Sequence, residues 1–155
     1  LTQNLAAGNS IGYFANLYCF TMLNPPTGTQ SFVATRANCY ALSCATAYYS
    51  GVTSLGTPIT NNSVGTATVS LAATSTSTTT LYANAFTFLP TAAGDAFTAY
   101  NQTQRSPTTL ATSPDGGYDP LVFGDAIGNG ATLTFSVHQS GTNGTAGGII
   151  LPLVP

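Results

Sequence analysis

Charged side chains are almost missing from this chain. Lysine and glutamate are absent, and charged residues make up 4% of its 155 residues, against about 25% in a typical soluble domain. The charged residues are Arg36, Arg105, Asp95, Asp115, Asp119 and Asp125. Binding to nucleic-acid phosphates requires clustered Lys and Arg, so a basic nucleic-acid-binding surface is excluded. The absence of lysine also excludes a Lys–Asn isopeptide crosslink.

Long apolar runs are missing as well. The longest candidate, Ile11 to Leu23, is interrupted by Gly12, Asn16 and Thr21 and is shorter than the roughly 18 residues that a membrane helix requires. Intrinsic disorder needs low hydrophobicity and high net charge, whereas this chain is 43% hydrophobic with a formal net charge of −2. We therefore expect one compact domain that does not span a membrane.

Few groups titrate and few sites suit a trypsin-like protease, since Arg36 and Arg105 are the only basic residues apart from His138. Stability should consequently depend weakly on pH. The sequence begins at Leu1 and not at methionine, which suggests an export signal that has been removed. We expect an extracellular protein.

Cysteine is scarce: Cys19, Cys39 and Cys44 allow one disulfide and leave one thiol. In a straight strand, the sulfurs of Cys39 and Cys44 would be too far apart to join, while a turn would allow a small closed loop. We favour a Cys39–Cys44 bridge, with a bridge from Cys19 as the alternative. No CxxC pair is present and His138 is distant, so no zinc site is expected.

Catalytic signals are weak. His138, Asp125 and a serine could form a hydrolase triad, but no G-x-S-x-G motif is present and a single His in a strand is usually structural. Asp115, Asp119 and Asp125 could gather around calcium, although EF-hand spacing is absent and Asx turns are the simpler role. We predict no catalytic residue, no metal and no cofactor other than N-linked glycans.

What the sequence does contain is short β-strand patterns separated by Gly, Pro and Asn turns. Residues 11–23 are apolar at both odd and even positions, which is typical of a strand covered on both faces. The turn "NPPTG" follows, and residues 29–35 are the expected hairpin partner.

Two alternating segments, 64–72 and 81–89, flank the hydroxyl run "ATSTSTTT" at 73–80. A mucin-like stalk would carry prolines, so we interpret the run as a hairpin with a Ser/Thr tip. Residues 121–123, 131–139 and 148–154 supply further strands. About seven to nine strands predict an all-β antiparallel sandwich, immunoglobulin-like or jelly-roll.

Three N-x-[ST] sequons lie in predicted loops and make N-glycosylation our expectation. Their acceptors are Asn61, Asn101 and Asn143. Glycans together with hydroxyls would keep a nearly uncharged surface soluble.

The two ends of the chain could each pair with a neighbour. Residues 1–10, "LTQNLAAGNS", carry apolar side chains at 1, 5 and 7, on one parity, and "SGTNGTAGG" forms a tether before "IILPLVP". Either segment could complete another subunit's sheet, and repeated head-to-tail donation builds a filament. Alternatively, both segments are edge strands of their own sandwich or are loose.

An exported, lysine-free β domain rich in Thr, Asn and Gly, with an apolar N-terminal tail, a Cys pair and sequons, resembles the archaeal thread filament subunits. Those look like chaperone-usher pilins, which are incomplete immunoglobulin-like sandwiches linked by N-terminal donor strands. The resemblance implies a donor tail at 1–10, a sandwich domain at 11–155, and a homopolymer of identical subunits for adhesion or cell–cell contact.

Site residues follow from the same resemblance. The donor residues would be Leu1, Gln3, Leu5 and Ala7. The acceptor groove would be formed by Leu133, Phe135, Val137, Ile149, Ile150 and Leu151. The three sequons would be glycosylated.

Two other functions share parts of this pattern. A viral capsid or spike jelly roll would have similar composition, but the basic arm of a genome-packaging capsid is missing. A monomeric carbohydrate-binding module could stack sugars on Tyr48, Tyr49, Tyr100 and Tyr118, although the chain lacks tryptophan.

Overall fold

The computed structural model describes residues 2–5, 17–35, 42–64, 67–88, 96–105, 109–112, 118–140 and 145–155. These residues contain strands and no helix. The strands are β1 (Thr2–Leu5), β2 (Cys19–Thr21), β3 (Ser54–Leu55), β4 (Ile59–Val64), β5 (Thr68–Thr74), β6 (Leu81–Phe88), β7 (Phe97–Tyr100), β8 (Thr103–Gln104), β9 (Thr109–Thr112), β10 (Tyr118–Ile127), β11 (Thr132–Gln139) and β12 (Thr145–Val154). No helix in the described ranges is long and apolar enough to cross a membrane.

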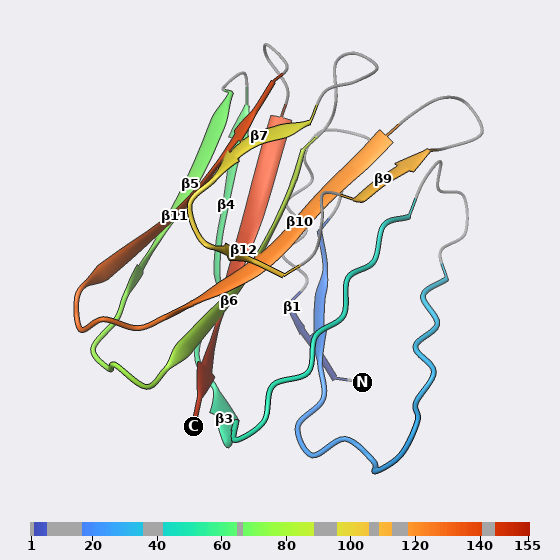
Figure 1. Cartoon of the computed structure of the whole chain (residues 1–155), viewed down its shortest axis with the longest axis vertical. Coiled ribbons are helices and arrows are strands. Elements are labelled where there is room, and N and C mark those ends of the chain that lie inside the picture. Colours follow the sequence, from blue (N-terminus) through green and yellow to red (C-terminus); the bar gives the residue numbers. More distant parts are fainter. Residues whose placement is uncertain are drawn as a thin grey trace.

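The strands build two antiparallel sheets that pack on each other (Figure 1). The large sheet has the order β3-β12-β6-β10-β8, with β4 also paired to β12 and β9 to β10. The small sheet has the order β5-β11-β7. β1 and β2 form a separate pair beside them. The predicted all-β antiparallel sandwich is confirmed.

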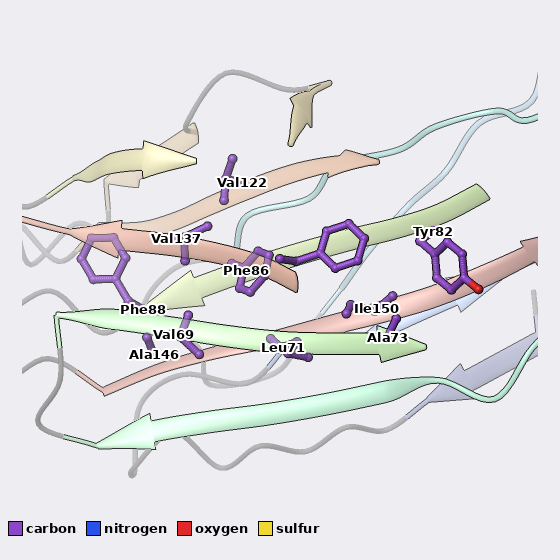
Figure 2. Packing of buried hydrophobic residues seen from close by; sticks show 11 residues of the cluster. Val69, Leu71, Ala73, Tyr82, Phe86, Phe88, Val122, Val137, Ala146 and Ile150 are labelled. Carbon is purple, nitrogen blue, oxygen red and sulfur yellow. The ribbon is translucent and has the colours of Figure 1, made fainter. Parts of the chain in front are cut away.

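The main core lies between the two sheets. On β5, Val69, Leu71 and Ala73 are buried and alternate with exposed neighbours, because successive side chains of a strand point to opposite faces. Figure 2 shows them with residues of β6 and β12 in the same cluster. The ring centroids of Phe88 on β6 and Phe97 on β7 lie 4.8 Å apart, edge to face, and join the two sheets.

The hydroxyl run does not form the predicted hairpin. β5 pairs with β11 in the small sheet, whereas β6 pairs with β10 and β12 in the large sheet. The connection therefore crosses between the sheets, so that the apolar faces of both strands meet in the core. Ser75 is 1% exposed, donates its amide to Ala131 O and donates its hydroxyl to Ser77 O.

The C-terminal segment is a central strand and not a tether. β12 pairs with β6 along one edge and with β4 and β3 along the other. Pro152, which has no amide hydrogen, lies at the interruption between β4 and β3, where Gly56 donates its amide to Pro152 O at 2.9 Å. This position explains how a proline is tolerated inside the sheet. The pairing of β12 along both edges within its own chain removes the reason to regard this end as a rival donor.

The outer face of the large sheet is also buried. Ile149, Leu151 and Leu153 of β12 point away from the small sheet and are 3–6% exposed. Leu17 and Cys19 contact this face, as do Tyr49 and Val52. We call residues 17–19 and 49–52 the N-terminal cover. Both faces of β12 are consequently apolar, which explains its continuous hydrophobic run.

The prediction for 11–23 is wrong in the described part. Only residues 19–21 form a strand, and Tyr18 and Phe20 are 45% and 53% exposed. β2 pairs with β1 and joins neither sheet, so only one of its faces is covered. The expected hairpin partner is missing too, because residues 29–35 form no strand and are exposed throughout.

Candidate functional site

β7 is an edge strand of the small sheet and borders a hollow. β7 pairs with β11 on one side, and no strand of the described ranges pairs with its other side. Thr98 and Ala99 are exposed there. Beside them lies a hollow of about 220 Å³, lined by Phe97, Thr98, Ala99, Tyr100, Gln104 and Val122. Backbone groups of β7 and this hollow together suit an added strand.

Tyr100 anchors the inner wall of this hollow. Its ring meets Phe86 edge to face, with centroids 6.3 Å apart, and its hydroxyl donates to Asn84 Oδ1 at 2.6 Å. Gly124 leaves the necessary room, because a Cβ at that position would collide with the hydroxyl oxygen of Tyr100. The Nδ2 of Asn84 is buried without a hydrogen-bond partner among the described residues. These contacts hold the Tyr100 ring beside the hollow, whose lining combines apolar side chains with the polar Thr98 and Gln104.

The opposite face of β10 carries an ion pair between the buried Asp125 and the exposed Arg105. Asp125 is 2% exposed, and its Oδ2 and Oδ1 accept hydrogen bonds from Arg105 Nε at 2.7 Å and Arg105 Nη2 at 3.0 Å. Tyr49 also donates its hydroxyl to Asp125 Oδ2 at 2.9 Å. Because Tyr49 belongs to the N-terminal cover, this network ties the cover to the large sheet. Asp125 is thus occupied structurally, and His138 takes no part in this network, because it binds Thr68 instead; Asp115 lies outside the described residues.

Two phenols are held in environments that favour their neutral form. Burial raises the pKa of Tyr49, and the hydrogen bond to the Asp125 carboxylate raises that pKa further. Burial likewise raises the pKa of Tyr100, with the negative charge of Asp125 acting in the same direction. The hydrogen bond to Asp125 also raises the pKa of Arg105.

These shifts predict a loss of stability at alkaline pH. A phenol whose pKa is raised in the folded state stabilises the fold below its ordinary pKa of 10.0, and this contribution is lost as the pH rises above that value. We expect the melting temperature of the protein to fall above about pH 10. Measuring thermal unfolding from pH 8 to 12 tests this prediction. Tyr49→Phe should reduce the slope with which the melting temperature falls as the pH rises. An equal slope in wild type and variant would contradict it.

The sequon acceptors occupy different settings. Asn61 lies in strand β4 and not in the expected loop; it is exposed and donates Nδ2 to Ser70 O at 3.0 Å. Asn101 follows β7, where Nδ2 donates to Thr134 O at 3.0 Å and Oδ1 accepts from Ser136 N at 2.9 Å. Its amide thereby extends the pairing of β7 with β11. Asn143 lies outside the described residues.

The residues predicted to line an acceptor groove are mostly inside this chain's own cores. Phe135, Val137, Ile149, Ile150 and Leu151 are 0–4% exposed, and Leu133 packs against the same main core. These positions are covered by strands of the same chain, because β11 is the central strand of the small sheet and β12 lies in the middle of the large one.

The predicted donor segment is partly described. β1 pairs with β2 through Thr2↔Thr21 and Leu5↔Cys19, with an irregularity between Gln3 and Leu5. Leu1 and Ala7 lie outside the described residues. β1 is strand-forming and stands apart from both sheets.

The cysteines and the histidine form no cluster. Cys44 carries a free, exposed thiol, which disagrees with the expected Cys39–Cys44 bridge; Cys39 lies outside the described residues. Cys19 is a free thiol whose pKa is raised by burial. His138 Nδ1 shares a hydrogen bond with Thr68 Oγ1 at 2.9 Å. Within the described ranges no group of three or more His, Cys, Asp or Glu could hold a metal ion.

Aromatic side chains proposed to stack on sugars are largely engaged elsewhere. The hydroxyls of Tyr49 and Tyr100 are hydrogen-bonded to Asp125 and Asn84. Tyr48 is 78% exposed, and the side chain of Tyr118 lies outside the description. Of the three tyrosines whose side chains the structure describes, Tyr48 is the one left open for stacking.

Sequence reasoning missed the β7 edge. The signal is short: "FTAY", at 97–100, has apolar side chains at its two ends and small ones between them. Comparisons of this chain with protein-family models, with curated proteins and with solved structures found no match.

Proposed function

We propose that the chain is the structural subunit of an extracellular surface filament, assembled head to tail from identical copies by strand donation, for adhesion or cell–cell contact. The observation that carries the proposal is the unpaired outer edge of β7 with its adjoining hollow. The donor is the N-terminal segment 1–10 of a neighbouring copy.

The two sheets differ in width at this edge. The small sheet ends at β7, whereas the large sheet continues through β10 to β8 and β9. A strand added to β7 would extend the small sheet over this part of the large sheet and would satisfy the free backbone groups of β7. The apolar wall of Phe97, Tyr100 and Val122 would receive its inward side chains.

The donor must be able to leave its own subunit. β1 pairs only with β2, and that pair joins neither sheet, so its release leaves the hydrogen bonds of both sheets intact. The segment has Leu1 and Leu5 on one parity and Thr2 and Asn4 on the other. This alternation suits a strand with one face buried.

The low charge supports assembly of identical copies. A formal net charge of −2 over 155 residues creates little mutual repulsion between subunits. N-linked glycans on the exposed Asn61 and on the sequon acceptor Asn143 would keep such a filament soluble.

Negative-stain electron microscopy of the secreted full-length chain tests the proposal. We expect filaments from the wild type and from Thr2→Ala/Asn4→Ala, because these side chains lie on the parity that stays outside. Leu1→Ser/Leu5→Ser should abolish filaments, because the buried apolar side chains are lost. Filaments that persist in this second variant would exclude donation by the N-terminus.

A second matched pair of variants tests the acceptor edge. Thr98→Lys places a charge on the free edge strand, and Thr134→Lys makes the same change on the exposed face of central strand β11. We expect the first substitution to prevent assembly and the second to permit it. Equal behaviour of both variants would place the acceptor elsewhere.

A further inference from the structure

Residues 22–35 form an arm that is exposed along its whole length and contains no strand. All fourteen residues are exposed, including Met22 and Leu23 at 41% and 43%, Phe32 at 58% and Val33 at 81%. Large apolar side chains at both ends of one exposed segment are the kind of surface that marks an interaction site when they gather into a patch. The arm is therefore incomplete in the isolated chain.

More exposed apolar side chains lie close to the arm in sequence. Of the nine large hydrophobic residues that are exposed in the described ranges, eight belong to residues 18–48: Tyr18, Phe20, Met22, Leu23, Phe32, Val33, Leu42 and Tyr48. Figure 1 shows residues 17–35 and 42–53 on the side of the molecule that carries β1 and β2. We call these eight residues the apolar arm surface.

The charge of this region restricts its partner. Residues 17–35 and 42–55 contain no charged side chain, and Arg36 is the only charged residue before Asp95. Nucleic acid and strongly charged proteins would find no electrostatic complement here. A second copy of the chain offers an equally uncharged and apolar surface.

The size of the surface agrees with such a contact. Eight roughly half-exposed apolar side chains offer on the order of 600 Å² together, close to the roughly 800 Å² that each partner buries in a standard interface. A pairing of like surfaces around a two-fold axis buries this area on both copies.

We propose that the apolar arm surface pairs with the same surface of a second copy of this chain. This contact goes beyond strand donation, since it uses neither residues 1–10 nor the edge of β7. In a filament, this contact would join two neighbouring rows of subunits side by side. It would also form between chains that donate no strand.

Hydrogen exchange of the full-length chain, read by mass spectrometry over a dilution series, tests this inference. Peptides covering 22–35 should exchange slowly at high concentration and quickly on dilution, because association protects the arm. Peptides covering 1–10 report strand donation in the same sample. The two contacts are thus measured separately, and either can fail without the other.

Phe32→Ser/Val33→Ser removes the most exposed apolar side chains of the arm without touching the cores. We expect sedimentation velocity to show self-association through the arm weakened about 100-fold, with an unchanged melting temperature. The matched control is Ile127→Ser, because Ile127 is 60% exposed at the end of β10. This control should associate like the wild type.

Three results would overturn the inference. The first is rapid exchange of 22–35 at every concentration. The second is equal association of Phe32→Ser/Val33→Ser and the wild type. The third is protection of the arm only when phosphatidylcholine vesicles are added, which would assign the surface to a lipid membrane.

Discussion

Replacing Gly148 by valine is expected to lower the free energy of unfolding by about 3 kcal/mol. Gly148 lies on β12 directly beside Phe86 of β6, on the face that meets the small sheet. A Cβ at this position would lie 2.5 Å from two ring carbons of Phe86 and 2.6 Å from Leu71 Cδ1. Because Phe86 and Leu71 are 0% and 3% exposed, neither side chain can move into free space.

Urea unfolding measures this effect. The slope of the unfolding free energy against urea concentration is compared between the variants. Thr134→Val is the control, since it places a valine at an exposed strand position where the side chain is already β-branched and should change stability by less than about 0.5 kcal/mol. Phe86→Ala combined with Gly148→Val should cost less than the sum of both, because the smaller side chain makes room. Wild-type stability of Gly148→Val would show that β12 does not pack against Phe86.

The same glycine shows what the sequence could and could not predict. The strands with clear alternation, such as β5 and β11, were found because one face is apolar and the other polar. "SGTNGTAGG" was interpreted as a tether on composition alone. Gly147 and Gly148 nevertheless lie inside β12, because a strand glycine can mark a close approach between side chains from two sheets. That approach depends on partners distant in the sequence.

Pairing between strands was harder to predict than the strands themselves. The segments around "ATSTSTTT" were expected to pair because they are adjacent, but Val69 and Leu71 meet residues of β6 across the core instead. The acceptor groove was placed on the most apolar strands, β11 and β12, and a strand is most apolar where its own chain covers it. An open edge strand such as β7 carries the exposed Thr98 and Ala99. Its sequence is inconspicuous because a strand that its own chain leaves uncovered is less apolar.

The second large effect is expected at Asn101. Asn101→Ala removes two side-chain hydrogen bonds to the backbone of β11, to Thr134 O and from Ser136 N. The loss should lower the free energy of unfolding by about 2 kcal/mol. It should also raise hydrogen exchange at the C-terminal end of β7, because the amide continues the pairing of that strand. Urea unfolding and amide exchange measure both quantities.

Asn101 is also a sequon acceptor, and a second variant separates its two roles. Thr103→Ala destroys the sequon Asn101-Gln102-Thr103 and leaves the asparagine amide in place. If the amide stabilises the β7 edge, only Asn101→Ala lowers stability, and protein from a host without N-glycosylation behaves in the same way. If a glycan is responsible, Thr103→Ala reproduces the loss. Because both polar atoms of this amide already bind backbone groups of β11, we expect the first result, which would make Asn101 a part of the edge that receives the neighbouring strand.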